Sequence, residues 1–214
     1  MIPDLNLELK TGWSTVVSKG VGANPPALYG IKQYLGKLGL FTQGIKGQYC
    51  DWLAAIHRPI PVANPTGLAM EFIFSFSFTT AIFCQCLEFD GILTRQLKKF
   101  NCSFQINIAE GWQLQISAQD GSWIGIGVQV APLAPDTDHT ACMIYKYDTV
   151  KDVYSFISIT IDGVTYAIPS KFQNLAAIVT NWSDTFSVQL QHDANALGGS
   201  FSASVRSLNL FWEE

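Results

Sequence analysis

Charge is scarce in this sequence. Only 14% of its 214 residues are charged, against roughly 25% in an average soluble protein. The balance is acidic, with a formal net charge of -4, so the chain lacks the basic surface that nucleic-acid binding requires. It also lacks a polybasic segment of the kind that attaches proteins to anionic membranes. Hydrophobic residues make up 48% of the chain, enough for a large core, which excludes general disorder.

Long apolar runs and targeting segments are also missing. The most hydrophobic region, from Met70 to Phe89, is interrupted by polar residues, so we expect no transmembrane helix. The first residues have neither the basic nor the apolar part of a signal peptide. Two N-glycosylation sequons nevertheless begin at Asn101 and Asn181. We interpret the chain as a secretory or extracellular glycoprotein without its signal peptide; the alternative is a cytosolic protein with chance sequons.

The cysteines show no zinc-binding pattern. Their spacing lacks the paired C-x-x-C motifs of a zinc site, and a bridge within Cys84-Gln85-Cys86 would be strained. An odd number leaves at least one thiol free and allows at most two disulfides of undetermined pairing. Buried cysteines that act as small hydrophobic residues are the other reading. The five are Cys50, Cys84, Cys86, Cys102 and Cys142.

Apolar and polar residues alternate along much of the chain, which is typical of β-strands with one buried face. Such runs include 72–78, 103–108, 112–117, 142–147, 156–161, 186–191 and 207–212. Hairpin dipeptides punctuate them at Asp90-Gly91, Glu110-Gly111, Asp120-Gly121 and Asp162-Gly163. We predict one all-β domain over residues 1–214, an antiparallel β-sandwich. Short helices are expected near 31–38 and 170–176, and long loops at 18–26 and 131–138.

Several of these segments resemble the concanavalin A-like lectin and glucanase jelly rolls. The resemblance lies in residues 87–90, 107–116 and 158–166, in the last strand to Trp212, and in Gly12-Trp13 and Asp51-Trp52. It implies a jelly-roll fold that hosts lectins, glycosidases, lyases and non-carbohydrate binders alike. A looser similarity is to small fungal natural-product cyclases, such as the hetero-Diels–Alderases of tropolone-sesquiterpenoid pathways.

The sequence lacks one of the catalytic residues that a glucanase of this fold needs. Retaining glucanases of this fold carry E-x-D-x-E or E-x-D-x-x-E on one strand. Glu88-Phe89-Asp90 supplies the first half, but the acid position holds Ile92 or Leu93. We therefore interpret Glu88 as a structural or ligand-binding carboxylate and not as part of a hydrolase. A polysaccharide lyase is weakly supported, because an acidic chain suits a polyanionic substrate poorly.

A metal-dependent lectin is also weakly indicated. Asp136-Thr137-Asp138-His139 brings two carboxylates and a histidine close together but lacks the rest of a calcium ligand set. A solvated turn explains it better. The other histidines, His57 and His192, are scattered, and no phosphate loop, dinucleotide motif or nucleophile elbow is present. We expect no metal and no cofactor.

Amide side chains occupy the polar faces of several predicted strands. If those strands are neighbours, the amides share the concave outer surface of one sheet. They form either a ligand site with aromatic walls or simply a solvated sheet face. The residues are Gln105, Asn107, Gln113, Gln115, Gln189 and Gln191.

Two functions compete on this basis. The first is a cofactor-free enzyme that cyclises an apolar or aromatic substrate by positioning and hydrogen bonding, and composition favours it. Its catalytic contacts would be Gln113, Gln115 and Tyr145; its other substrate contacts would be Trp52, Glu88, Gln105, Asn107, Tyr147, Phe156 and Gln189. The alternative, favoured by fold frequency, is a metal-independent carbohydrate-binding module that uses aromatic platforms such as Trp52, Trp123 or Trp182. A third possible function is that of an interaction protein. We expect the chain to be a monomer or a homodimer.

Overall fold

A computed structural model describes most of the chain as antiparallel strands. It describes residues 2–6, 13–16, 29–34, 37–44, 50–58, 66–182, 185–194 and 199–213. Side chains are described for 71, 73, 75–182 and 203. Within these residues no helix is long and apolar enough to cross a membrane.

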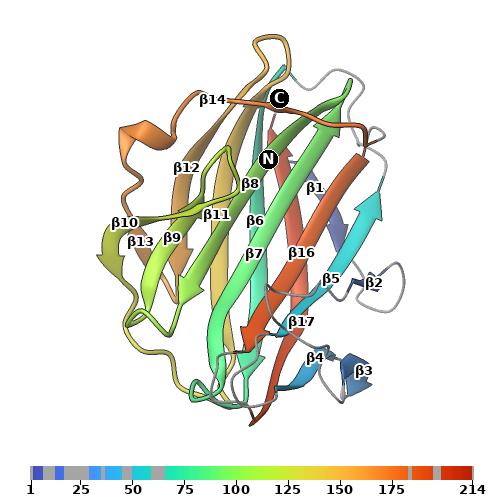
Figure 1. The fold of residues 1–214 in the computed structure, drawn as a ribbon. Coiled ribbons are helices and arrows are strands. Elements are labelled where there is room, and N and C mark those ends of the chain that lie inside the picture. The colour runs from blue at the N-terminus through green and yellow to red at the C-terminus, as the bar shows by residue number, and fades with distance from the viewer. Residues whose placement is uncertain are drawn as a thin grey trace.

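The strands form two sheets that lie face to face (Figure 1). The nine-stranded sheet has the path β13 (Val164–Tyr166), β12 (Val153–Ile161), β11 (His139–Asp148), β6 (Thr66–Phe78), β17 (Gly199–Glu213), β4 (Lys37–Gly44) and β3 (Tyr29–Tyr34). Beside it, β1 (Ile2–Asn6) pairs with β17, and β14 (Leu175–Ala176) pairs with β12.

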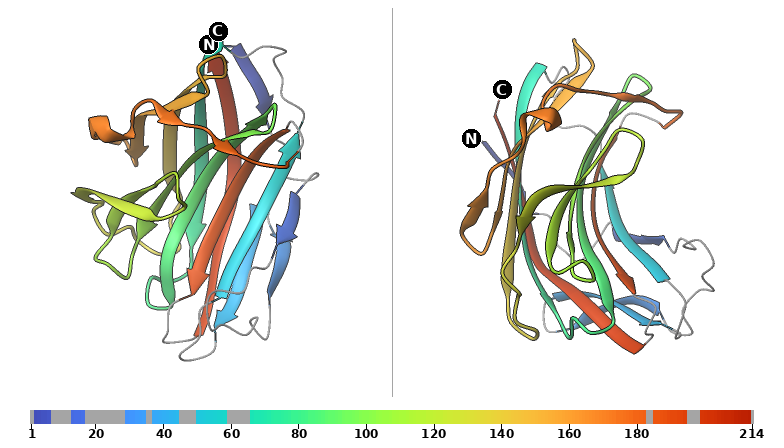
Figure 2. Two further views of the ribbon diagram at one scale, coloured as in Figure 1. Left: turned by 45° about the horizontal axis from the view of Figure 1, so that its top comes forward. Right: turned by 60° about the vertical axis from the view of Figure 1, so that its left-hand side comes forward.

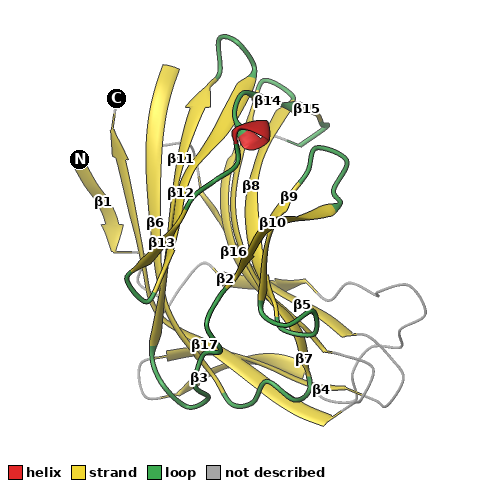
Figure 3. Ribbon diagram, turned by 90° about the vertical axis from the view of Figure 1, so that its left-hand side faces the viewer, coloured by secondary structure: helices red, strands yellow, loops and turns green. Residues whose placement is uncertain are grey.

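The eight-stranded sheet has the path β10 (Trp123–Gln129), β9 (Gln113–Ser117), β8 (Lys98–Asn107), β7 (Cys84–Arg95), β16 (Thr185–Ala194), β5 (Cys50–Arg58) and β2 (Trp13–Val16). The short strand β15 (Ile178–Val179) pairs with β8. Seen from the side, this sheet curves, with its outer face on the inside of the curve (Figure 3). The predicted antiparallel β-sandwich is confirmed.

An aromatic core joins the two sheets, which appear as separate layers in Figure 2. Phe76 of β6 meets Phe89 of β7 with ring centroids 5.1 Å apart, and Phe100 of β8 meets Tyr147 of β11 edge-on at 6.0 Å. These rings are fully buried. Edge-to-face contacts of this kind contribute about 0.5–1.5 kcal/mol each beyond area burial. The predicted alternation therefore places its large apolar residues between the sheets.

Two local predictions are wrong. The segment 31–38 is not helical, because it contributes to β3 and β4, which pair with each other as a hairpin. Asp90-Gly91 is not a turn but lies within β7, where Gly91 pairs with Cys102. Gly91 lacks a side chain at a buried position, and the Tyr147 hydroxyl donates to its carbonyl oxygen at 3.4 Å.

The other turns agree better with those predicted from the sequence. Gly111, Gly121 and Gly163 have φ values of 77°, 82° and 80°, in the region that glycine adopts at low cost. The helix expected near 170–176 is reduced to one 3₁₀ turn, η1 (Ser170–Phe172), followed by β14. The loop predicted at 131–138 connects β10 to β11, whereas the one predicted at 18–26 lies outside the described residues.

Candidate functional site

The outer face of the eight-stranded sheet carries the candidate site. Leu87 and Phe89 of β7 point into the core, so Glu88 and Asp90 lie on the opposite face. The register pairs Glu88 with Gln105 of β8, and Gln105 with Gln115 of β9. A continuous row of polar side chains therefore crosses three strands, and Figure 1 views this face of the sheet.

Gln115 is the centre of a hydrogen-bonded amide network. Its Oε1 accepts from Gln105 Nε2 at 2.5 Å and from Asn107 Nδ2 at 3.3 Å. Its Nε2 donates to Glu110 Oε2 and to Gln113 Oε1, both at 2.8 Å. A primary amide has two donor hydrogens and two acceptor lone pairs, so the hydrogen-bonding capacity of Gln115 is fully used within the protein.

Exposure separates this network into a buried base and an accessible edge. Gln105, Asn107 and Gln115 are only 4–5% exposed, although all belong to the outer face. Gln113 and Glu88 are half-buried and can be reached from solvent. The structure thus brings together five of the predicted site residues, but Gln115, one of the three predicted catalytic contacts, supports its neighbours instead of presenting a free group.

The Gln113 side chain lies across β10. A Cβ atom added to Gly125, which pairs with Gln115, would approach the Gln113 side chain to 3.0–3.1 Å. The absence of a side chain at Gly125 therefore makes room for the amide of Gln113. Sequence reasoning missed this role, since Gly125 belongs to no recognisable turn motif.

Asp90 is a second residue that sequence reasoning missed as part of this face. It is 3% exposed, and its Oδ1 has no hydrogen-bond partner. Burial raises its pKa from 3.8 to about 6, although hydrogen bonds with Ser103 and Glu88 and the charge of Lys99 oppose the change. Burial also lowers the pKa of Lys99, against the effect of the two carboxylates. The outer face therefore holds a carboxyl group that ionises near pH 6.

Two tryptophans border the polar row. Trp123 begins β10, is half-buried and pairs with Ser117, whose hydroxyl accepts from Asn101 Nδ2 at 3.0 Å. Trp182 is 44% exposed, and the Lys99 Nζ lies 4.9 Å from the centre of its ring. The carbohydrate-binding alternative predicts both as aromatic platforms. Only the backbone is described for Trp52 and Gln189: Trp52 pairs with His192, and Gln189 pairs with Asp90.

Tyr145, Tyr147 and Phe156 do not share this face, so their prediction as site contacts is wrong in position. All three are fully buried in the core. The Tyr145 hydroxyl donates to Met143 Sδ at 2.8 Å, and burial raises its pKa well above the ordinary value.

A β-bulge explains the error at Phe156. Between Ile144 and Tyr145 the register with β12 shifts, so that Ile144 pairs with Ser158 while Tyr145 pairs with Phe156. The extra residue, Ile157, is 47% exposed. Strict alternation would have buried Ile157 and exposed Phe156; the bulge reverses both.

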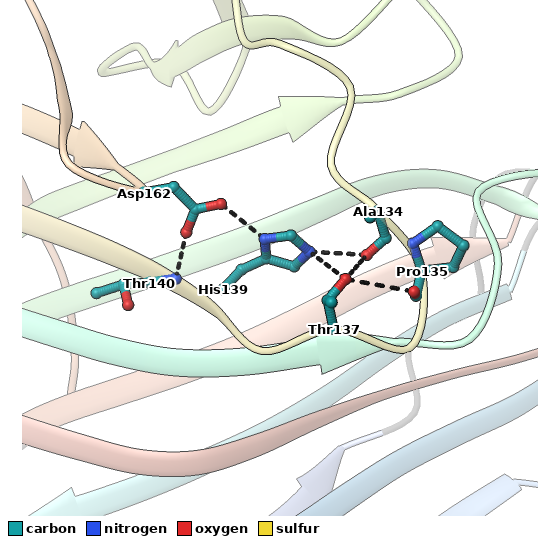
Figure 4. Close-up of polar contacts among 6 residues, drawn as sticks. All are labelled: Ala134, Pro135, Thr137, His139, Thr140 and Asp162. Atoms are coloured by element: carbon teal, nitrogen blue, oxygen red, sulfur yellow. Dashed lines mark hydrogen bonds and ion pairs between the residues drawn. The ribbon is translucent and has the colours of Figure 1, made fainter.

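His139 is buried in a hydrogen-bonded cluster, so the predicted solvated turn is wrong for this residue, whereas Asp136 and Asp138 are exposed (Figure 4). Its Nδ1 lies 2.7 Å from Asp162 Oδ2, and its Nε2 lies 2.8 Å from the Ala134 carbonyl oxygen. The ring stacks on Phe78 at 5.9 Å. Both nitrogens face acceptors, so the cluster fastens the 131–138 loop to the β12–β13 turn.

No group of three or more potential metal ligands occurs in the part of the chain that the structure describes. Three of the cysteines are buried and a fourth is half-buried, and all four are free thiols: Cys84, Cys86, Cys102 and Cys142. Burial raises the pKa of Cys102 well above its ordinary value, so this thiol remains protonated and packs as a small apolar group.

No protein-family model matches the sequence, and neither does any curated protein. Solved structures do match. The carbohydrate recognition domain of Emp46p has 11% identity and a TM-score of 0.53, with 98% of this chain and 95% of that chain covered. Lectin UEA-II complexed with galactose has 11% identity and a TM-score of 0.51, with 94% and 99% covered.

An enzyme also has this shape. The endo-β-1,4-glucuronan lyase of the fungus Trichoderma reesei has 12% identity and a TM-score of 0.53, with 92% of this chain and 86% of that chain covered. At such low identities these likenesses establish the fold alone. The chain therefore has the concanavalin A-like, lectin-type jelly roll that the sequence predicted.

Proposed function

We propose that this protein is a carbohydrate-binding module whose ligand lies on the outer face of the eight-stranded sheet. The observation that carries the proposal is the fixed amide network beneath Gln113. Gln115 donates to Gln113 and is itself held by Gln105 and Asn107, so Gln113 is fixed before any ligand arrives. Sugar hydroxyls both donate and accept hydrogen bonds, and prearranged polar groups bind them without a further ordering cost.

The border of the face suits a sugar as well. The rings of Trp123 and Trp182 offer flat apolar surfaces, one half-buried and one exposed, and tryptophan combines such a surface with a polar N–H group. The Emp46p and UEA-II structures support the same ligand class, since one is a carbohydrate recognition domain and the other contains galactose.

The cyclase hypothesis has less support. It required aromatic walls beside the glutamines, but Tyr145 and Phe156 lie in the core on the other side of the sheet. The described part of the outer face offers amides, carboxyl groups and serine hydroxyls instead. A polar face of this kind matches a hydroxylated ligand better than an apolar polyene.

Secretion and glycosylation remain predictions of the same proposal. Asn181 is exposed, as a modified asparagine must be. Asn101 is half-buried within β8 and its amide already donates to Ser117. Of the two sequons, we therefore expect only Asn181 to carry a glycan. We expect the protein to pass through the secretory pathway and to be a monomer or a homodimer.

The test compares binding in matched variants. A thermal-shift screen identifies a glycan that stabilises the native state, and calorimetry then measures its affinity. We expect Gln113→Ala to weaken binding by about tenfold, equivalent to one hydrogen bond. Gln173→Ala, a change at an exposed glutamine outside this face, should leave binding unchanged. Equal affinities of wild type and Gln113→Ala, or stabilisation by apolar molecules alone, would overturn the proposal.

A further inference from the structure

The hydrogen bonds of the amide network all run from donor to acceptor in one orientation. That orientation determines whether Gln113 presents a donor or an acceptor to a ligand. Each Asn or Gln amide carries donors at one end and an acceptor at the other, and a half-turn exchanges them. A ring of amides alone can therefore adopt either direction. A group that only accepts or only donates is needed to choose between them.

Glu110 supplies both kinds of group. Its carboxylate can only accept, and Oε2 lies 2.8 Å from Gln115 Nε2. Its backbone N–H can only donate, and it lies 3.1 Å from Asn107 Oδ1. A half-turn of Gln115 would place two acceptor oxygens together, and a half-turn of Asn107 would place two donor groups together.

The orientations of the remaining amides follow from these two contacts. Gln115 Nε2 faces Glu110, so Gln115 Oε1 faces Asn107 and Gln105 and accepts from both. The second hydrogen on Gln115 Nε2 is donated to Gln113 Oε1. Gln113 thus uses its acceptor oxygen inside the network and keeps its Nε2 group for the accessible edge.

We infer that Glu110 is a positioning residue that makes Gln113 present an N–H donor, so that the bound sugar must place an acceptor oxygen there. A hydroxyl, an N-acetyl carbonyl or a carboxylate on the glycan would meet this requirement. The inference rests on the proposed function, because it concerns the same face and the same ligand class. Glu110 itself need not touch the ligand.

The first arm of the test needs no ligand. In wild-type protein, the side-chain amide NMR signals of Gln115 and Gln113 should move together as the pH is lowered. In Glu110→Gln this shared movement should disappear, because the acceptor-only group is gone. Gln173 serves as the reference signal in both proteins. Signals of Gln115 and Gln113 that titrate identically in wild type and Glu110→Gln would overturn the network's dependence on Glu110.

The second arm uses the glycan that gives the largest thermal shift with wild-type protein. We expect Glu110→Gln and Gln115→Met each to weaken its binding by about tenfold. The double variant should bind no more weakly than either single variant, because both changes remove the same constraint. Additive losses would mean that Glu110 acts separately from Gln115 and would overturn the inference.

The two arms fail separately. If wild-type protein binds no glycan, the proposed function falls while the amide titration still tests the role of Glu110. If glycan binds and the double variant behaves additively, the function stands and the positioning role falls. If Gln115→Met does not fold, as a lowered or lost thermal transition would show, the titration in Glu110→Gln alone decides the inference.

Discussion

Asp90 is the residue whose burial is least compensated in the described part of the site. Its carboxyl is almost completely buried and one of its oxygens is unpartnered. Burial of this kind disfavours the charged form. The residue weakens the folded state at neutral pH while it adds an ionisable group to the outer face, a combination that is common at functional sites.

Replacing Asp90 should therefore stabilise the protein. The folded-state pKa of about 6 lies above the ordinary value of 3.8, so folding holds a proton that the unfolded chain releases. The wild-type penalty is absent below about pH 4, grows as the pH rises to 6, and is complete above it. We expect Asp90→Asn to raise the free energy of unfolding by about 1–3 kcal/mol at pH 7.5.

Urea denaturation at several pH values measures this effect. The gain from Asp90→Asn should shrink towards zero at pH 4, because the carboxyl is then protonated in both states. Asp120→Asn is the matched control, since Asp120 is exposed and its pKa is lowered by hydrogen bonds from Ser122. A gain for Asp90→Asn that is the same at pH 4 and pH 7.5 would contradict the account.

The sequence predicted the location of the amides better than their roles. Alternation with Phe104, Ile106 and Leu114 was sufficient to place Gln105 and Gln115 on one outer face, because a strand exposes every second residue. The saturation of Gln115 depends on Glu110, which lies in a turn five residues earlier. No periodic pattern encodes a contact of that kind.

At the scale of elements, bulges and tight packing limited the prediction. The bulge at Ile157 moved Phe156 from the expected outer face into the core. Gly91 was expected in a turn because Asp-Gly often forms hairpins, yet the strand β7 continues through it. In both cases the contacts with a neighbouring strand, which sequence alone does not show, outweighed the local signal.

The 131–138 loop, which connects β10 of one sheet to β11 of the other, gives a test at this scale. His139 carries two hydrogen bonds and stacks on Phe78. We expect His139→Phe to preserve the stacking but to lower the free energy of unfolding by about 1–3 kcal/mol, through the loss of both hydrogen bonds. Chemical denaturation measures the change.

Thr137→Val serves as the control within the same loop. Thr137 is exposed; its hydroxyl donates to the Ala134 carbonyl oxygen and lies at the edge of the cluster, 3.4 Å from His139 Nε2. Its loss should cost no more than about 0.5 kcal/mol, as at most exposed sites. If His139→Phe is as stable as Thr137→Val, the cluster does not fasten the loop as described.

At the scale of the whole molecule, the inner and outer faces of the two sheets differ in what constrains their residues. The core between them is built from aromatic rings contributed by both sheets, which explains why the fold is shared with lectins at about one residue in nine identical. Packing tolerates wide substitution if volume and pattern are kept. The outer faces are free to differ, and here one of them carries the amide network.

The most direct test of the central claim is chemical-shift mapping of a glycan added to the isotope-labelled protein. The account predicts that shifts concentrate at Gln113, Glu88 and Trp123, on the outer face of the eight-stranded sheet. Lys146 and Ile157, on the outer side of the nine-stranded sheet, should not move. Shifts confined to the nine-stranded sheet, or none with any glycan of the panel, would contradict it.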